Sequence, residues 1–99
     1  MGSNEPDWHP EALLDAEEAK AWYAERSLLA AHGFALAVDQ AVAAVVEAPE
    51  RWPSRRGNCR YVFPNRYPFH LIYRLGSERK IQIVAVAHQK RRPGYWRDR

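Results

Sequence analysis

The spacing of apolar residues changes once along this 99-residue chain, close to residue 50. Over residues 10–48 apolar side chains recur every three to four positions, which is the period of one face of a helix. Over residues 58–88 they alternate or run continuously and are rich in β-branched and aromatic types, which is typical of strands. A helical segment followed by a strand-forming segment predicts an α+β fold in which the two parts cover one another.

Two helices are predicted in the first half of the chain. The first covers residues 10–26 (PEALLDAEEAKAWYAER), with Pro10 at the first helical position and acidic residues in the early turns. The second covers about residues 28–48, and Ser27 is a suitable residue to cap its beginning. Gly33 inside this helix costs about 1 kcal/mol relative to alanine, and we interpret it as allowing close approach of the first helix.

Three strands are predicted in the segments CRYVF, PFHLIYRL and KIQIVAVAH. The connectors FPNRYP and GSER are short enough for antiparallel hairpins, so residues 58–88 should form an antiparallel meander. We therefore expect a single domain over residues 1–99, in which a helical hairpin at residues 10–48 packs on one face of a small antiparallel sheet of three to four strands. Only that face should need a cover. Residues 89–99 would form a basic and aromatic C-terminal segment.

Charge is distributed very unevenly between the two halves. Residues 1–50 contain two basic and ten acidic side chains and residues 51–99 contain thirteen basic and two acidic ones, so the halves carry formal charges of −8 and +11. Twelve of the fifteen basic residues are arginine, whose planar guanidinium binds phosphate or carboxylate through two parallel hydrogen bonds. The acidic half can neutralise part of this charge as surface pairs. The excess predicts an anionic partner for residues 51–99.

The composition argues against several classes of protein. The single cysteine, Cys59, cannot form an internal disulfide, which fits a reducing cytoplasm. The first residues, MGSNEPDWHP, lack a basic region followed by an apolar one, and no segment approaches the roughly 20 apolar residues of a membrane span, so we expect neither a secretion signal nor a membrane partner. Cys59, His70 and His88 fall on neighbouring predicted strands but lack the spacing of a metal motif, so we expect no metal and no cofactor.

The second half of the chain carries a series of short motifs in a characteristic order. These are a proline–aromatic start of the middle strand (YPF), then IYR, a strand ending in VAH, RRP and a final YWRDR. The segment YPFHLIYRLGSERKIQIVAVAHQKRRPGYWRDR thus resembles the C-terminal half of RelE/ParE-type toxins of type II toxin–antitoxin modules. The helical half agrees in WHPEALLDAEEAKAWYAERS and EAPERWP. The resemblance covers about Trp8 to Arg99 and is nearer to the ParE-like, plasmid-stabilisation branch.

The family fold opens with a short strand that joins the sheet before the first helix. Here residues 1–9 contain Pro6, charged residues and only Trp8 as a large apolar side chain. We expect either that this strand is vestigial or that the start of the gene is displaced. In both cases one sheet edge would be poorly covered.

The resemblance implies a toxin that poisons its own cell unless an antitoxin is present. The antitoxin of such a pair typically wraps an acidic, partly disordered tail around the toxin, which gives a hetero-oligomer. ParE-like members are described as inhibitors of DNA gyrase, and RelE-like members cleave mRNA in the ribosome without a metal. We interpret the chain as a ParE-like toxin that acts by binding in the cytoplasm. The alternatives are a RelE-like ribosome-dependent endoribonuclease and a decayed module that is no longer toxic.

The resemblance also indicates where RNA-cleaving chemistry would lie. Arg60 and Tyr95 align near catalytic positions of RelE, but His70 and Gln89 stand at two positions where RelE has basic residues. Gln89 cannot transfer a proton, so cleavage would depend on His70, His88 or Tyr95 as acid and base. This weakens the enzymatic reading and leaves it open.

Several residues are expected to contact the antitoxin or the target, foremost Arg91 and Arg92. The full set is Arg60, Arg74, His88, Lys90, Arg91, Arg92, Arg97 and Arg99. His88 is either a functional imidazole or a hydrogen-bonded structural residue, and His70 is expected in a solvated position. Tyr95 and Trp96 either stack on bases or pack the chain end back on the fold, and for Trp96 we expect packing.

Overall fold

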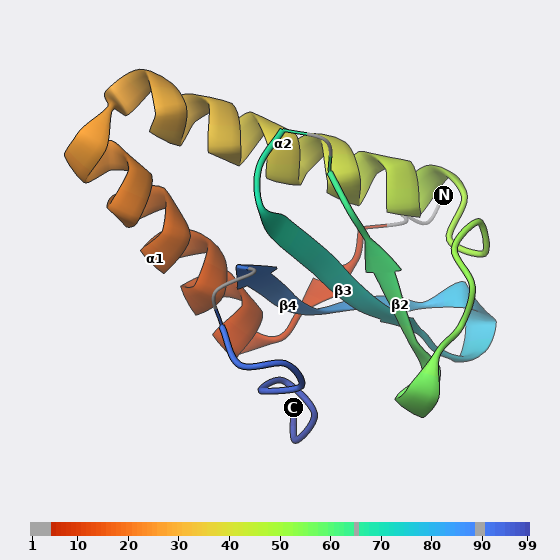
Figure 1. Ribbon diagram of the computed structural model, residues 1–99. Helices are drawn as coiled ribbons and strands as arrows, with labels where there is room; N and C mark the ends of the chain where they lie inside the picture. The colour runs from red at the N-terminus through yellow and green to blue at the C-terminus, as the bar shows by residue number, and fades with distance from the viewer. Residues whose placement is uncertain (1–4, 65, 89–90) are drawn as a thin grey trace.

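Within the residues that the structure describes, 5–64, 66–88 and 91–99, four strands form one sheet in the order β1-β4-β3-β2. In this computed structural model, two helices lie across one face of the sheet (Figure 1). The elements are β1 (Asp7–Trp8), α1 (Pro10–Arg26), α2 (Leu28–Glu47), β2 (Cys59–Val62), β3 (Phe69–Leu75) and β4 (Ile81–His88). The predicted α+β arrangement of a helical hairpin on a small sheet is confirmed.

Both helices begin where the sequence predicts, because each has a side-chain cap. Nδ1 of His9 accepts a hydrogen bond from the N–H of Glu11 at 3.1 Å, and Pro10 follows in the first turn. Oγ of Ser27 accepts a hydrogen bond from the N–H of Ala30 at 3.1 Å, which caps α2. Each cap satisfies a backbone donor that the helix itself cannot pair.

The N-terminal strand is present in reduced form. Asp7 pairs with Gln82 and Trp8 with Ile83 in a parallel ladder, and the N–H of His9 donates to the Ile83 carbonyl at 2.9 Å. A strand of two residues is therefore present before the first helix, and the alternative of a displaced gene start stays a prediction. The sheet is therefore mixed, which corrects the expectation of a wholly antiparallel sheet; the antiparallel meander is formed by β2, β3 and β4.

The main core lies between the helices and the sheet. It consists of Ala12, Phe34, Val38, Ala41, Val45, Val62, Phe69, Leu71, Tyr73, Ile81, Ile83 and Val86. The ring of Phe34 on α2 meets that of Phe69 on β3 edge-on, with centroids 5.1 Å apart. The buried hydroxyl of Tyr73 donates to the carbonyl of Pro49 at 2.6 Å, so the core contains this polar group without leaving it unpaired.

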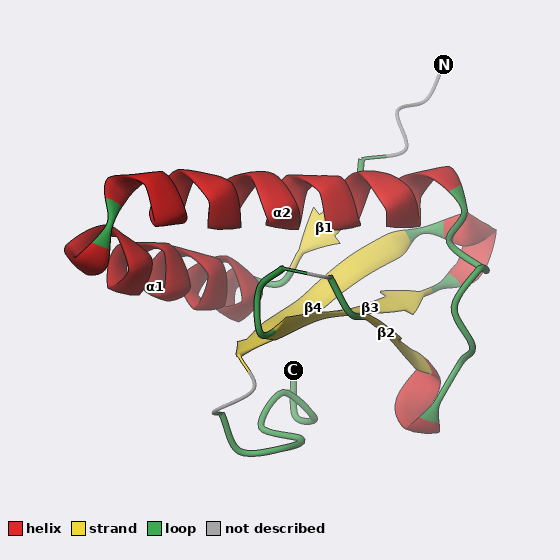
Figure 2. Cartoon of the chain, turned by 45° about the horizontal axis from the view of Figure 1, so that its top comes forward, coloured by secondary structure: helices red, strands yellow, loops and turns green. Residues whose placement is uncertain are grey.

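The opposite face of the sheet carries a second, smaller core. Its buried members are Cys59, Ile72, Val84, Ala85, Ala87 and Trp96, and Tyr61 and Tyr95 pack against them. Trp96 and Tyr95 belong to the C-terminal segment, which lies on the side of the sheet away from the helices (Figure 2). The expectation that only one face needs a cover was therefore wrong. Strands β3 and β4 are buried on both faces.

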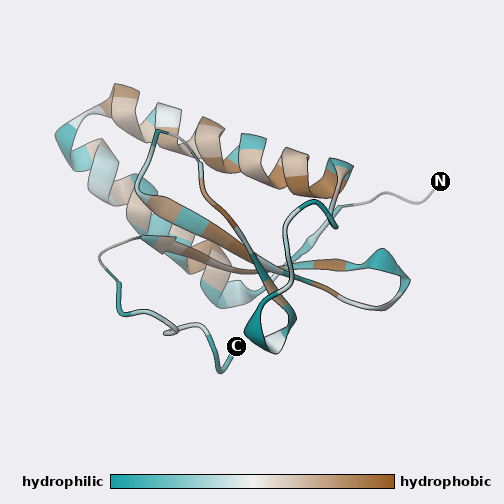
Figure 3. Ribbon diagram, turned by 45° about the vertical axis from the view of Figure 1, so that its right-hand side comes forward, coloured by the Kyte–Doolittle hydropathy of each residue, from teal (hydrophilic) through white to brown (hydrophobic). Residues whose placement is uncertain are grey.

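A β-bulge in β4 places two consecutive residues on the same face of the sheet, in the second core. Ile72 pairs with Ala85 and Tyr73 pairs with Ile83, so the ladder skips Val84. Val84 and Ala85 consequently both belong to the second core, while Ile83 belongs to the main core. The continuous apolar run of this strand, visible as brown ribbon in Figure 3, is the sequence counterpart of burial on both sides.

Gly33 faces a different neighbour from the one expected. A Cβ at this position would clash with Oη of Tyr67, which lies in the connector between β2 and β3. The same hydroxyl donates to the carbonyl of Ala30 at 3.2 Å. The interpretation that Gly33 admits α1 was wrong, because the missing side chain makes room for the β2–β3 connector.

Helix α2 is strongly apolar in composition. By length and composition alone it is long and apolar enough to cross a membrane, which corrects the expectation that no segment is. Leu29 and Leu36 on its outer side are exposed, whereas Phe34 and Val45 are buried against the sheet. A core helix of a water-soluble protein passes the same test, so this is weak evidence for a membrane span.

Candidate functional site

The C-terminal segment, residues 91–99, is held under the sheet by Trp96. The indole is only 6% exposed. It lies edge-on to Tyr61 of β2 and to Tyr95, with ring centroids 5.8 and 5.5 Å apart. The prediction that Trp96 packs the chain end back on the fold is confirmed. The segment is thus positioned by burial, and its polar side chains are presented from a fixed backbone.

Asp15 of α1 binds the same segment through hydrogen bonds and an ion pair. Oδ2 accepts hydrogen bonds from Nη1 of Arg99 at 2.8 Å, from Oη of Tyr95 at 2.9 Å and from the N–H of Val86 at 3.1 Å. Oδ1 accepts from Nη2 of Arg99 at 3.3 Å. Glu11, one turn earlier on α1, pairs with the same guanidinium at 3.6 Å. One nearly buried carboxylate therefore joins α1, β4 and the C-terminal segment.

Burial determines the protonation behaviour of this cluster. Burial raises the pKa of the Tyr95 hydroxyl, and the charge of Asp15 and the hydrogen bond to it raise the pKa further. For Arg99, burial works to lower the pKa, but the hydrogen bond to Asp15 and its charge outweigh burial and raise the pKa. At neutral pH Tyr95 is a neutral hydrogen-bond donor and Arg99 is a cation, and both are engaged by the same carboxylate.

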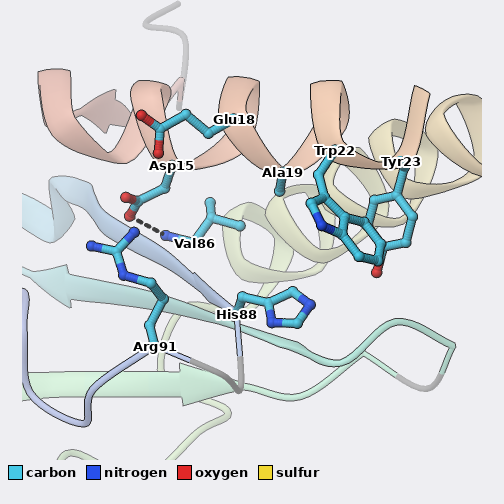
Figure 4. A pocket seen from close by; sticks show the side chains of 8 residues that line it. All are labelled: Asp15, Glu18, Ala19, Trp22, Tyr23, Val86, His88 and Arg91. Atoms are coloured by element: carbon cyan, nitrogen blue, oxygen red, sulfur yellow. Dashed lines mark hydrogen bonds between the residues drawn. The ribbon is translucent and has the colours of Figure 1, made fainter. Parts of the chain in front are cut away.

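A cleft of about 260 Å³ opens between α1 and the end of β4 (Figure 4). It is lined by Asp15, Glu18, Ala19, Trp22, Tyr23, Val86, His88 and Arg91. Trp22 is 45% exposed, and the guanidinium of Arg26 lies 3.7 Å from the centre of its ring. Since the cleft has apolar walls and both signs of charge at its border, it suits an amphipathic side chain of a partner protein better than a simple ion.

A second hollow, of about 210 Å³, lies on the other face of the sheet between the strand ends and the C-terminal segment. We call it the aromatic–arginine hollow; it is lined by Tyr61, His70, Ala87, His88, Arg91, Pro93, Gly94, Tyr95, Trp96 and Arg97. Gly94 has φ of 79°, and a Cβ there would lie 2.9 Å from Nε of Arg97, so this turn requires glycine. His88 and Arg91 border both the cleft and the hollow.

The two candidate catalytic histidines lie on adjacent strands but point to opposite faces. Phe69 pairs with His88, and His70 pairs with Ala87. Directly paired residues share a face, and Phe69 belongs to the main core whereas Ala87 belongs to the second core. His88 therefore points toward the helices, where its ring centroid lies 6.4 Å from that of Trp22.

His70 lies against an aromatic side chain at the border of the aromatic–arginine hollow. Its ring centroid is 4.5 Å from that of Phe63, and the residue is partly buried. Burial lowers the pKa of His70, and the positive charge of Arg55 lowers it further. The expectation of a fully solvated imidazole is therefore corrected to a partly buried one that is neutral at pH 7.

Three of the predicted contact arginines are bonded to the backbone of the chain itself. Nη1 of Arg60 donates to the carbonyl of Trp52. Nη1 of Arg74 donates to the carbonyl of Arg99 at 3.1 Å. Arg99 donates in turn to the carbonyl of Val84 at 3.0 Å, and its side chain is only 9% exposed. Each of these residues has a structural role, and contact with a partner stays a prediction.

Three other predicted contact residues, Arg91, Arg92 and Arg97, are exposed. They are arranged along the C-terminal segment, where the structure leaves their charge accessible to a partner. Lys90 and Gln89 lie outside the described residues, so the expectation for Lys90 and the argument from Gln89 stay predictions. In the described ranges no group of three or more His, Cys, Asp or Glu side chains could hold a metal ion.

Asp15 and Glu11, one turn apart on α1, were not among the residues predicted from the sequence to form the site. A signal for Asp15 was present, because it lies between Ala12, Ala16 and Ala19 on the side of the first helix that the apolar period assigns to the core. A carboxylate on such a face needs a buried cation or several donors. Which residue supplies them is not visible in the sequence.

Comparison with known proteins agrees with this architecture. Among solved structures, a chain described as "Chromosomal ParDE TA system from P. aeruginosa" is similar with a TM-score of 0.65 at 20% sequence identity, and the match covers 87% of this chain and 98% of that chain. None of the curated proteins matches significantly. A family model described as "ParE toxin of type II toxin-antitoxin system, parDE" matches residues 7–93. Because this match spans most of the chain, the protein belongs to the ParE toxin family of type II toxin–antitoxin systems.

Proposed function

We propose that this toxin arrests growth by binding an essential target, DNA gyrase, and that an antitoxin with an acidic tail neutralises it. Membership in the family implies a cognate antitoxin of the ParD type. The gyrase target follows from the resemblance to the ParE-like branch, and the acidic tail follows from the charge of this chain. The toxin would act in the cytoplasm and form a hetero-oligomer with its antitoxin.

The observation that carries the proposal is the exposed arginine surface of the second half of the chain. Residues 51–99 contain thirteen basic and two acidic side chains. Arg79 and Arg99 pair with Glu50 and Asp15 of the acidic half. Within residues 51–99, the exposed arginines apart from Arg79 are Arg51, Arg55, Arg56, Arg66, Arg91, Arg92 and Arg97. A surface of this kind attracts an acidic protein segment and speeds its association.

The candidate acid and base groups are poorly suited to cleaving RNA. The hydroxyl of Tyr95 already donates to Asp15, and its raised pKa opposes proton loss at neutral pH. His70 and His88 point to opposite faces of the sheet, so they do not form a facing acid–base pair. General acid–base catalysis needs both groups within hydrogen-bonding reach of one reacting centre. These features support binding over catalysis.

The proposal is tested by inducing variants in bacteria and measuring DNA synthesis, translation and mRNA cleavage. The variants are Arg91→Ala/Arg92→Ala, His88→Ala and Tyr95→Phe, and the control is Arg51→Ala/Arg56→Ala, which removes the same charge elsewhere. We expect DNA synthesis to stop first, mRNA to stay intact, and the Arg91/Arg92 change to relieve the arrest more than the control does.

Two results would contradict this function. Ribosome-dependent mRNA cuts that weaken by about 10²- to 10⁴-fold in His88→Ala or Tyr95→Phe would identify a RelE-like endoribonuclease. A folded protein that binds its antitoxin but never arrests growth would be a decayed module.

A further inference from the structure

The aromatic–arginine hollow has a charge composition suited to an anion. Arg91 and Arg97 supply fixed positive charge, and His70, which points to this face of the sheet, supplies an imidazole. None of its ten lining residues is Asp or Glu, whereas two carboxylates line the cleft beside α1. Arginines around a concave surface without carboxylates concentrate anions there and can bind phosphate through paired hydrogen bonds.

The walls of the hollow are aromatic, and the aromatic surface continues beyond it. Tyr61, Tyr95 and Trp96 belong to the lining. Phe63 stacks on Tyr61 with centroids 6.2 Å apart and an interplanar angle of 19°, and it lies 4.5 Å from the ring of His70. Phe63 is 51% exposed, so the stack is accessible from outside. The exposed ring of Phe63, with arginines nearby, is the kind of surface on which nucleobases stack, whereas Arg55 already lies over the ring of Tyr61 and Arg91 over that of Tyr95.

Between the two strands beneath the hollow, the backbone is not available to bind an extended peptide. At this point β3 and β4 pair with each other, through Phe69 with His88 and His70 with Ala87. A peptide strand therefore could not insert between β3 and β4 and could add only at the outer edge of β2 or β4, so recognition inside the hollow must use side chains. The volume of about 210 Å³ lies below the range of roughly 300–1,000 Å³ typical of pockets for drug-sized molecules, which fits one ring system with an attached charged group.

We propose that the hollow, together with Phe63, is a binding site for single-stranded nucleic acid. One base would enter among the aromatic rings, and Arg91 and Arg97 would contact the neighbouring phosphates. Stacking on aromatic faces tolerates every base, and guanidinium groups match phosphate, so the site would bind without strong sequence preference. An acidic peptide segment offers charge to the arginines, but its carboxylates offer no ring to the exposed face of Phe63. The site is additional to the proposed function, which requires only protein partners.

The test is a fluorescence anisotropy titration of the purified full chain with fluorescein-labelled oligo(U) and oligo(dT) of about ten nucleotides. The site variants are Arg97→Gln and Phe63→Leu, both at exposed positions. The control is Arg51→Gln, an exposed arginine outside the lining that removes the same charge. Thermal melts confirm that each variant is folded.

We expect saturable binding that weakens about tenfold or more in Arg97→Gln and about fivefold to a hundredfold in Phe63→Leu, but less than about threefold in Arg51→Gln. Tighter binding of oligo(U) would assign RNA as the ligand, and tighter binding of oligo(dT) would assign DNA.

The proposal is overturned if neither oligonucleotide binds saturably, or if Arg51→Gln weakens binding as much as Arg97→Gln. It is also overturned if Phe63→Leu has no effect and polyglutamate displaces the oligonucleotide, because the site would then bind carboxylates. The measurement involves neither gyrase nor an antitoxin, so its outcome is independent of the proposed function.

Discussion

Asp15 accepts hydrogen bonds from three groups in two distant parts of the chain, namely the backbone of β4 and, in the C-terminal segment, the hydroxyl of Tyr95 and the guanidinium of Arg99. At the residue scale this carboxylate differs from the solvated acids around it on α1. A buried charge is tolerated only while its hydrogen-bond partners are present. If one partner is removed, the remaining buried group has lost its hydrogen bond and cannot form one with water instead. Two predictions belong to this cluster.

Replacing Asp15 by alanine should destabilise the fold strongly. The Asp15→Ala change leaves the Arg99 cation and the Tyr95 hydroxyl without their carboxylate, and we expect the free energy of unfolding to fall by about 3–5 kcal/mol. For a chain of this size the Tm should then fall by more than about 12 °C. Urea and thermal unfolding measure both quantities. The control is Glu18→Ala, at an exposed position on the same helix, which should change stability by less than about 0.5 kcal/mol. Equal losses of unfolding free energy in the two variants would show that the Asp15 cluster does not stabilise the fold.

The raised pKa of Tyr95 predicts a loss of stability in alkali. An unfolded tyrosine loses its proton near pH 10.0, while Tyr95 in the folded chain keeps its proton to higher pH. The stabilisation that Tyr95 provides is complete below pH 10.0. It is lost as the pH rises from 10.0 toward the higher pKa of the folded state, because the unfolded state then releases a proton that the folded state holds. Tyr95→Phe should reduce the slope of unfolding free energy against pH by at most about 1.4 kcal/mol per pH unit. Tyr23 and Tyr73, whose pKa values are also raised, remain in both proteins. Identical slopes for the two proteins would contradict the assignment.

At the scale of the element, the C-terminal segment acts as the second cover of the sheet. The helices cover one face of β3 and β4, and Trp96 with Tyr95 covers Ile72, Val84 and neighbouring residues on the other. Ion pairing at Asp15 and burial of Trp96 anchor this short segment, which has no helix or strand of its own within residues 91–99. Its arginines are therefore presented from an anchored backbone.

Truncating Trp96 should loosen this cover. Trp96→Ala removes a 6%-exposed indole from the second core, and we expect a loss of about 3–5 kcal/mol in unfolding free energy, as for other large-to-small core changes. Phe63→Ala is the matched aromatic control because Phe63 is 51% exposed, and it should cost less than about 1 kcal/mol. Hydrogen exchange of the β3 and β4 amides in Trp96→Ala would report whether the cover detaches before the sheet unfolds. An unchanged melting temperature would place the indole outside the core.

At the scale of the whole molecule, the acidic helical half lies against a basic half of sheet and loops. The pairs of Arg79 with Glu50 and of Arg99 with Asp15 connect the two. Much of the arginine surface nevertheless remains exposed, so the molecule has a strongly directional charge distribution. Such a field attracts an acidic partner and is weakened by salt.

Binding of the cognate antitoxin should accordingly depend on ionic strength. We expect the Kd to rise at least tenfold between about 50 mM and about 300 mM salt, because screening weakens contacts between exposed charges. Isothermal titration calorimetry at several salt concentrations measures this. An antitoxin segment with its acidic residues changed to amides is the control, and its Kd should vary little. A salt-independent Kd for the natural segment would mean that apolar contacts dominate the complex.

Much of the architecture followed from local signals. The boundaries of both helices depend on caps and periodicity within a few residues, and the three main strands were predicted to within about two residues of their ends. The motif order from YPF to YWRDR indicated the family, and the adjacent aromatic residues Tyr95 and Trp96 indicated that the chain end packs back on the fold. The exposed arginines of the C-terminal segment were also among the predicted contact residues.

By itself, the sequence determined the order of helices and strands, the family and the separation of charge, because these properties depend on residues close together along the chain. The tertiary structure alone decided the parallel pairing of β1, the neighbour of Gly33, the bulge at Val84 and the assembly of the Asp15 cluster. The bonds of Asp15 join residues 71 to 84 positions apart, to Val86, Tyr95 and Arg99. Contacts at such separation depend on how whole elements pack, and no local pattern specifies which distant donor meets a given carboxylate.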